Sequence, residues 1–225
     1  MRTVFGGSPA PNKIPATPIT RDLHQRWAVG DDPVAVRAAE DEAAILRLGA
    51  TYKRLTVFAD CVYRTSRAGL ALYPSEQSLF SMVHPDDTAA NLLPTVGMPT
   101  EPFIAAVYAP LAAGHHVDHQ IVRDWGINLQ VHRSVTSVKF YEDYPYTRDV
   151  AAVEAALSVF EPLRLRPEIT YLSEDAVAAK LDAIRCYRSQ LSTFWPDDAT
   201  MVAETRAMLD SVGGGRPAER CWVLD

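Results

Sequence analysis

The stretch Phe103–Leu129, FIAAVYAPLAAGHHVDHQIVRDWGINL, decides the fold. Its first part, FIAAVY over 103–108, is a short apolar run that predicts a strand. Pro110 and Gly114 end that strand. The segment from Asp118 to Leu129 has the apolar spacing of a helix. A strand that leads into a helix is the repeating unit of an α/β protein.

The segment before this stretch repeats the pattern. Residues 34–48 have helical spacing, with Asp31 and Asp32 as N-cap candidates, Pro33 in the first turn and Gly49 as the stop. Residues 53–59 (KRLTVFA) then predict a strand that ends at Asp60.

Later segments complete the alternation of strands and helices. Residues 135–141 (VTSVKFY) predict a third strand, and residues 150–157 and 173–191 predict helices. We therefore expect an α/β sandwich with a mostly parallel sheet, in which ligands gather beyond the carboxyl ends of the strands. We expect one domain over 1–225, with a proline-rich loop or arm at 8–20 and a tail at 213–225.

Composition limits the classes of function. The chain has 225 residues and a formal charge of -6, so a core needs no metal or disulfide staple, and the acidic balance argues against a nucleic-acid partner. Three widely spaced cysteines indicate a reducing, cytoplasmic setting. No apolar run reaches the roughly 20 residues of a membrane span.

The segment Gly114–His119 (GHHVDH) is the most specific feature, because it holds three of the six histidines. His116 and His119 are three residues apart at a helix start and are expected to face one ion, since neutral imidazole is a common zinc ligand. Asp118 is expected to orient an imidazole. The alternative is structural: these histidines cap the helix or lie on a surface loop.

A family resemblance rests on several motifs in order. They are Arg37-x-x-Glu40, Asp60-x-x-Tyr63-Arg64, the GHHVDH segment, Tyr141–Tyr146 (YEDYPY), Lys180 with Tyr187–Gln190, and Glu219–Trp222. Together they resemble the LmbE/PIG-L family of zinc-dependent N-deacetylases over nearly the whole chain. The resemblance implies a Rossmann-like three-layer fold and a zinc-dependent hydrolase that removes acetyl groups from N-acetylated sugars or related amines.

The resemblance also implies roles for single residues. His119 is the expected zinc ligand, and His116 stabilises the oxyanion or protonates the leaving amine, with Asp118 in support. Arg37 and Asp60 hold sugar hydroxyls. The acidic and aromatic residues of the third strand end, Tyr141, Glu142 and Asp143, shape the same pocket.

The sequence departs from the family pattern at its start. The family's first strand ends in an H-P-D-D-E motif that completes the zinc site, and this strand is expected to be absent here, through a mis-set start or a deletion. His84-Pro85-Asp86-Asp87 spells part of that motif. Either His84 and Asp87 are zinc ligands with Asp86 as base, or Asp86 or Asp87 caps a short helix.

Two functions therefore stay open. One is a zinc-dependent N-deacetylase with a small N-acetylated substrate, whose activity in this chain is open because the first metal motif is missing. The other is a metal-free sugar-binding or interaction protein on the same scaffold. A homo-oligomer is compatible with both.

Overall fold

The computed structural model describes residues 1–10, 13–27, 30, 32–98, 104–132 and 134–224. These residues form two compact units. Unit 1 comprises Met1–Tyr63 and Thr170–Glu219, and unit 2 comprises Arg64–Ile169 and Arg220–Asp225. The N-cap candidate Asp31 and the expected strand start at Phe103 lie outside the described residues.

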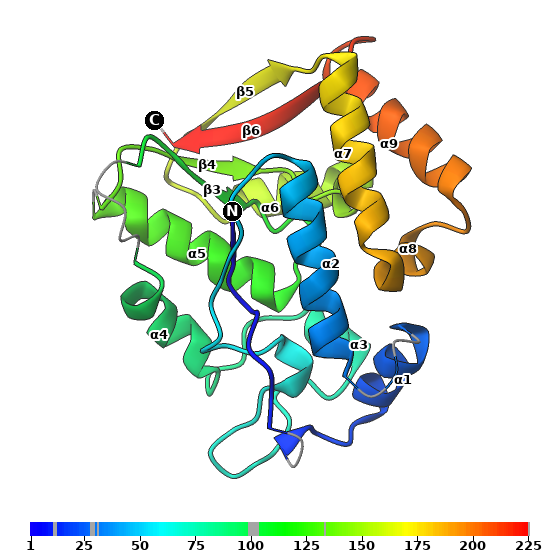
Figure 1. Cartoon of the computed structure of the whole chain (residues 1–225). Helices are drawn as coiled ribbons and strands as arrows, with labels where there is room; N and C mark the ends of the chain where they lie inside the picture. The colour runs from blue at the N-terminus through cyan, green and yellow to red at the C-terminus, as the bar shows by residue number, and fades with distance from the viewer. Residues whose placement is uncertain (11–12, 28–29, 31, 99–103, 133, 225) are drawn as a thin grey trace. The chain divides into compact units, whose positions relative to one another are not determined.

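Unit 1 is mainly helical (Figure 1). Its elements are β1 (Arg2–Thr3), α1 (Pro18–Trp27), α2 (Pro33–Arg47), β2 (Lys53–Arg54), the 3-10 turn η2 (Cys61–Tyr63), α7 (Glu174–Cys186), α8 (Arg188–Phe194) and α9 (Asp198–Val212). Strands β1 and β2 pair in parallel. Helix α2 packs along α7, as both ribbon views show.

Helix α2 forms where the sequence predicts it. The Asp32 carboxylate accepts a hydrogen bond from the Ala35 amide at 2.9 Å, and Pro33 occupies the first turn. Gly49 follows the helix with a φ of +67°, a conformation that suits glycine. On the buried side, Glu40 accepts hydrogen bonds from the amide and hydroxyl of Ser189, which anchors α8 to α2.

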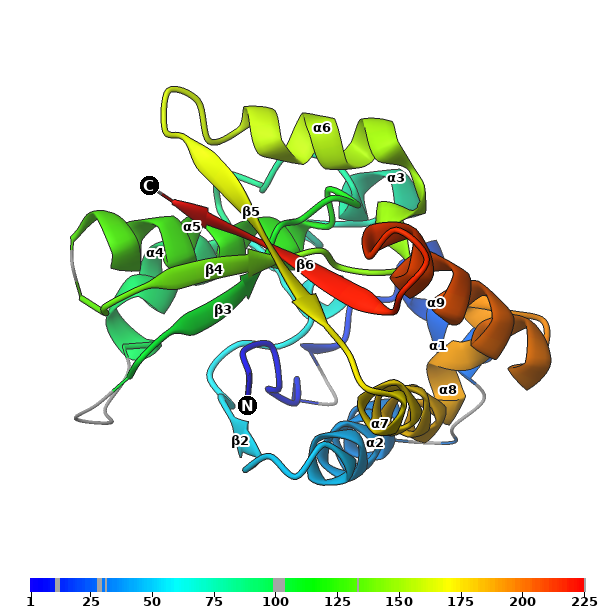
Figure 2. The same ribbon diagram turned by 90° about the horizontal axis from the view of Figure 1, so that it is seen from above.

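Unit 2 holds a four-stranded sheet in the order β3-β4-β6-β5 (Figure 2). Its elements are α3 (Glu76–Leu79), α4 (Thr88–Val96), β3 (Val107–Pro110), α5 (Val117–Val131), β4 (Val138–Tyr141), the 3-10 turn η3 (Tyr146–Arg148), α6 (Val150–Ser158), β5 (Leu165–Tyr171) and β6 (Ala218–Leu224). Two residues of β5 and two of β6 are counted in unit 1. Strands β3 and β4 are parallel, and β6 is antiparallel to β4. The four-stranded sheet is therefore mixed, whereas the expectation was a mostly parallel sheet, because β6 enters it beside β4 in the antiparallel direction. The expected α/β fold is confirmed.

The core of unit 2 lies where α5 meets β3 and β4. Val138 and Phe140 of β4 are fully buried. Gly126 of α5 faces them so closely that an added Cβ would lie 3.1 Å from both Ala109 and Phe140. The ring of Phe140 also packs edge-to-face on Phe160, with centroids 4.8 Å apart. This packing fixes the start of α5 relative to the strand ends.

Several predicted boundaries are wrong. The strand expected at 53–59 is only Lys53–Arg54 with a single bridge from Ala59 to Gly7, because the chain bulges in between and the Gly7 amide bonds to the Phe58 carbonyl. The strand expected at 103–108 is Val107–Pro110, since that segment is in register with Val138–Tyr141.

Three other expectations differ from the structure. The helix expected at 173–191 is divided at Tyr187, because the backbone of this residue leaves the helical conformation at φ −83° and ψ 55°. The last residues of the expected 8–20 arm begin helix α1, because Thr17 accepts the amide of Thr20. Most of the expected tail is strand β6, because pairing with β4 satisfies its backbone. A single domain over 1–225 remains a prediction.

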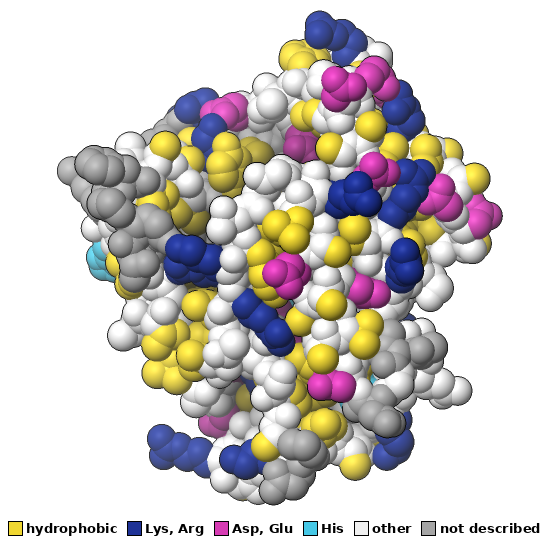
Figure 3. All heavy atoms as spheres, viewed as in Figure 1, with side chains coloured by type: hydrophobic (Ala, Val, Ile, Leu, Met, Phe, Trp, Pro, Cys, Tyr) yellow, Lys and Arg dark blue, Asp and Glu magenta, His cyan; other side chains and the backbone are white. Residues whose placement is uncertain are grey.

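Neither a patch of one charge nor a membrane-spanning helix was expected from the sequence. On the face drawn in Figure 3, basic and acidic side chains are interspersed, without a patch of one sign. No helix in the described part of the chain combines the length and the apolarity that a membrane crossing requires.

The buried contact between Phe140 and α5 yields a stability prediction. Phe140→Ala removes a fully buried ring and leaves a cavity, so we expect the free energy of unfolding to fall by about 3–5 kcal/mol. Val150→Ala is the control, because that side chain is 69% exposed, and it should change stability by less than about 0.5 kcal/mol. Urea unfolding measures both. A Phe140→Ala protein as stable as the control would contradict this packing.

Candidate active site

The loop between β3 and α5 carries the histidine cluster in a strained conformation. Ala112 and His115 have positive φ angles of 64° and 58°, which side chains with a Cβ rarely adopt. His116 then caps α5, and Val117 begins the helix. Strain of this kind persists only where surrounding contacts hold it, and it is typical of functional loops.

Asp143 supplies those contacts from the end of β4. One oxygen of its carboxylate accepts the Ala113 amide at 3.1 Å, and the other accepts Nδ1–H of His119 at 2.7 Å. The Asp143 side chain is only 4% exposed, whereas that of His119 is 33% exposed. The proton of His119 is therefore held on Nδ1, and the lone pair of Nε2 is available to a ligand. Polar residues that follow the neighbouring strands β3 and β4 thus contact each other.

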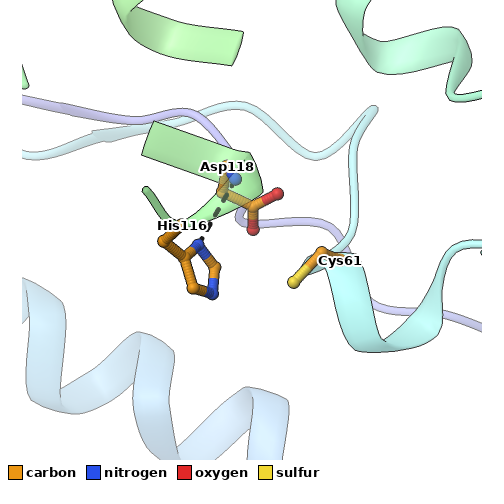
Figure 4. Close-up of side chains that lie close together, drawn as sticks. All are labelled: Cys61, His116 and Asp118. Atoms are coloured by element: carbon orange, nitrogen blue, oxygen red, sulfur yellow. Dashed lines mark hydrogen bonds between the residues drawn. The ribbon is translucent and has the colours of Figure 1, made fainter. Parts of the chain in front are cut away.

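His116 has the opposite arrangement (Figure 4). Its Nδ1 accepts the backbone amide of Asp118 at 3.3 Å. A neutral imidazole with Nδ1 as acceptor carries its proton on Nε2. A neutral His116 therefore carries its N–H at Nε2, and the centroid of its ring lies 5.4 Å from that of His119. The two neutral rings thus carry their protons on different nitrogens.

Asp118 is held on its other side by a buried arginine. Arg64 donates to the Asp118 carboxylate and lies 3.3 Å from that of Asp87. The side chains of Arg64 and Asp118 are each 10% exposed, and that of Asp87 is 1% exposed. Tyr73 also donates to Asp87 at 2.7 Å. The Asp118 carboxylate is thus engaged in an ion pair with Arg64, and its predicted role in orienting an imidazole stays a prediction. No separate role for Arg64 was predicted from the sequence.

The His84–Asp87 segment follows the structural alternative. Asp87 caps α4 by accepting the Ala89 amide at 3.0 Å, and its second oxygen binds Tyr73 and faces Arg64. Nδ1 of His84 accepts the Asp86 amide. The carboxylate of Asp87 is therefore occupied inside unit 2, and the alternative that makes Asp87 a zinc ligand is not supported.

The predicted substrate residues meet in unit 1. Arg37 donates to Asp60 at 2.9 Å, and its guanidinium lies over the ring of Trp27. Burial lowers the pKa of Arg37, but the Asp60 carboxylate outweighs this effect and the pKa is raised. Arg37 and Asp60 both line a cavity of about 170 Å³ within unit 1. A pocket shared with the histidines remains a prediction.

The same cavity has polar walls that the sequence did not reveal. Asp41, one turn after Arg37 on α2, accepts hydrogen bonds from Thr3 and, at 2.7 Å, from Tyr187. Burial and this hydrogen bond raise the pKa of Tyr187. The only sequence signal is that Arg37 and Asp41 share a helix face at a spacing of four residues.

The remaining residues of the third strand end have other partners. Glu142 accepts hydrogen bonds from Arg220 at 2.6 Å and Trp222 at 3.0 Å, which ties β4 to β6. Tyr141 pairs with Cys221 in the sheet and is 40% exposed. Their predicted place in the pocket stays a prediction, and Asp143 is the residue of this group that reaches a histidine.

The residues of unit 2 supply one of the ligands that a zinc ion needs. A catalytic zinc ion takes about three protein ligands. Nε2 of His119 fits one of them, while the carboxylates of Asp87, Asp118 and Asp143 are already engaged. Within the described residues of either unit taken alone, no three ligand side chains converge. The residues of unit 2 therefore do not make a complete zinc site.

Fold and site define a mixed α/β protein with a carboxylate-oriented histidine at a strand end. No family model and no curated protein matches the sequence. Solved structures do match. The zinc-inhibited form of teicoplanin deacetylase Orf2 has a TM-score of 0.77 and 22% identity, and the match covers 100% of this chain and 86% of that one. The A40926 pseudoaglycone deacetylase Dbv21 has a TM-score of 0.68, 24% identity and coverages of 100% and 84%, and a deacetylase–teicoplanin complex has a TM-score of 0.72, 23% identity and coverages of 99% and 85%. The chain therefore has the fold of these deacetylases.

The buried position of Arg64 yields a prediction. Arg64→Met leaves Asp87 and Asp118 without their cation, so we expect a loss of about 3–5 kcal/mol in the free energy of unfolding. Adding Asp118→Asn removes one uncompensated charge and should recover part of the loss. Urea unfolding measures both variants. A double variant that is less stable than Arg64→Met would contradict the ion-pair assignment.

The raised pKa of Tyr187 yields a pH prediction. Tyrosines of the unfolded chain ionise near pH 10, so above that pH the folded chain binds more protons, and the free energy of unfolding falls as the pH rises. Tyr187→Phe should reduce this slope by at most about 1.4 kcal/mol per pH unit. Urea unfolding between pH 8 and pH 11 measures it. An unchanged slope would show that Tyr187 is not buried against Asp41.

Proposed function

We propose that this chain is an N-deacetylase of the LmbE/PIG-L type, a hydrolase that removes the acetyl group from an N-acetylated sugar or related amine. The observation that carries the proposal is the hydrogen bond between Asp143 and Nδ1 of His119, which turns Nε2 outward as a metal ligand. The fold shared with solved deacetylases supports it. The substrate is a small molecule.

In the proposed reaction, the role of each residue follows from its hydrogen bonds. Nε2–H of His116 donates to the carbonyl oxygen as negative charge develops there, or to the nitrogen of the leaving amine. Asp118, fixed by Arg64, keeps its amide on Nδ1 of His116 and so maintains that proton on Nε2. Asp118 is therefore a positioning residue.

Arg37 and Asp60 bind the sugar in this proposal. Their ion pair presents both donors and acceptors at the cavity of unit 1, which suits hydroxyl groups. A bound zinc ion would supply a Lewis acid for the amide carbonyl. His119 is the ligand that unit 2 supplies for it.

The second candidate is a metal-free sugar-binding or interaction protein on the same scaffold. The incomplete ligand set of unit 2 favours it, since one histidine alone does not hold a catalytic ion. In this case Arg37 and Asp60 keep their role, and the histidines are structural.

The experiment measures zinc content and acetate release with N-acetylglucosamine after zinc loading. We expect about one zinc per chain, a loss of activity of at least about 100-fold in His119→Ala, and a 10–100-fold weaker zinc affinity in Asp143→Asn, because the orienting hydrogen bond is lost. His132→Ala is the control, since this exposed histidine ends the same helix.

The two candidates give different results. A protein without zinc or acetate release, whose affinity for N-acetylglucosamine is the same with and without His119→Ala, is the binding protein. In both cases Arg37→Met should weaken sugar binding by at least about tenfold, because the cavity loses the guanidinium donors that hold Asp60 and reach sugar hydroxyls. Unchanged binding in Arg37→Met would remove the substrate role of this pair.

A further inference from the structure

The cavity of unit 1 contains a cation that no described residue neutralises. The charged side chains that line this cavity of about 170 Å³ are Arg37, Asp41, Arg54 and Asp60. Arg37 is paired with Asp60, and both oxygens of Asp41 accept hydrogen bonds from neutral hydroxyl groups. Within the part of the chain that the structure describes, the guanidinium of Arg54 makes neither a hydrogen bond nor an ion pair. Arg54 thus has no role in the proposed function so far.

Strand pairing places Arg54 at the cavity. Arg54 of β2 is the register partner of Thr3 of β1, and the side chains of paired residues leave a sheet on the same face. Thr3 donates a hydrogen bond to Asp41 of α2. Arg54 therefore lies on the face of the strand pair that contacts α2, although it forms no ion pair with the described carboxylates of this cavity.

Gly6 makes room for the Arg54 side chain. A Cβ on Gly6 would lie 2.3 Å from Cγ and 2.6 Å from Nε of Arg54, so only glycine lets this side chain cross the backbone of residue 6. Gly6 has no positive φ angle, so glycine is required by the close approach and not by a left-handed conformation. Both residues line the cavity, so the contact holds the stem of Arg54 in its wall.

A second polar group of this wall lacks a partner. The hydroxyl of Tyr52, two residues before Arg54, is buried and makes no hydrogen bond of normal geometry with the described residues. A buried polar group without a partner costs free energy, which a ligand that accepts its proton recovers. The guanidinium of Arg54 likewise gains from an anion, because its planar fork of donors matches a carboxylate or phosphate group.

We propose that Arg54 and Tyr52 form an anion subsite, so that the substrate of this chain is an N-acylated amino sugar with a carboxylate or phosphate group. This inference rests on the proposed function, in which Arg37 and Asp60 of the same cavity bind sugar hydroxyls. That pair has no net charge and offers both donors and acceptors, whereas Arg54 adds donors with a net positive charge. The cavity of about 170 Å³ is far larger than the roughly 10–15 Å³ that one water needs, so it has room for such a group.

The experiment measures dissociation constants by calorimetry with the full chain, for N-acetylglucosamine, its 1-phosphate, its 6-phosphate and its uronic acid. We expect at least one of the anionic compounds to bind about tenfold or more tightly than the neutral sugar, because charge-assisted hydrogen bonds are the stronger ones. In Arg54→Gln this preference should fall below about twofold, while the affinity for the neutral sugar changes less than about threefold. Arg47→Gln is the control and should keep the preference, since this exposed arginine of α2 does not line the cavity.

Two further variants test the subsite without removing Arg54. Gly6→Ala displaces the Arg54 side chain and keeps its charge, so the preference for the anionic compound should fall. Asp41→Asn removes a negative charge from the cavity, so the same preference should rise. Shifts of opposite sign from residues of one cavity separate the effect of charge from a general loss of folding.

The compounds also identify the anionic group. A preference for the phosphates alone, or for the uronic acid alone, supports the subsite and names the group that it takes. Equal affinities for the neutral and the anionic compounds overturn the proposal. An equal loss of affinity for all compounds in Arg54→Gln also overturns it, because Arg54 then only supports the fold. A preference that is unchanged in Arg54→Gln, or no saturable binding of any compound, overturns it as well.

The outcome is separate from that of the proposed function. If no acetate is released but the preference depends on Arg54, the anion subsite stands and the hydrolase does not. If acetate is released from N-acetylglucosamine but the original chain has no preference for an anionic compound, the hydrolase stands and the anion subsite does not.

Discussion

The carboxylate of Asp143 holds both the loop after β3 and the first turn of α5. One oxygen holds the strained loop at Ala113, and the other fixes the proton of His119. Because the carboxylate is 4% exposed, water does not compete for these bonds. The parallel pairing of β3 with β4 brings Asp143 to this place, since their carboxyl ends lie at one edge of the sheet. The chemistry of the histidines depends on this arrangement.

A second buried network supports the same helix start. Arg64 lies between Asp87 and Asp118, so the cap of α4 and the first turn of α5 share one cation. The network gives Asp87 of the His-Pro-Asp-Asp segment a structural role, because its carboxylate caps α4 and faces Arg64. In the proposed reaction the network also separates the roles of neighbouring residues, since Asp118 positions His116, whereas His116 and His119 act on the substrate and the metal.

The sequence predicted the parts of the fold that local chemistry determines. Helix α2 was found from its cap and stop signals, and helices α5 and α6 from their apolar spacing. The hydrogen bond of His119 to Asp143 was missed, because Asp118, its neighbour in sequence, was expected to orient an imidazole. Strand β6 was missed because its place depends on distant pairing with β4. The ion pairs of Arg64 were missed for the same reason, since one partner lies 54 residues away in the chain. The place of Arg54 in the cavity gave no signal, because it depends on the pairing of β2 with β1.

The most direct test of the account is the tautomeric state of the two histidines, read from their ¹⁵N chemical shifts in the neutral form. The account predicts that His119 carries its proton on Nδ1, because Asp143 accepts it, and that His116 carries its proton on Nε2, because the Asp118 amide occupies Nδ1. His119 protonated on Nε2 would contradict it, because that nitrogen would then have no lone pair for a ligand.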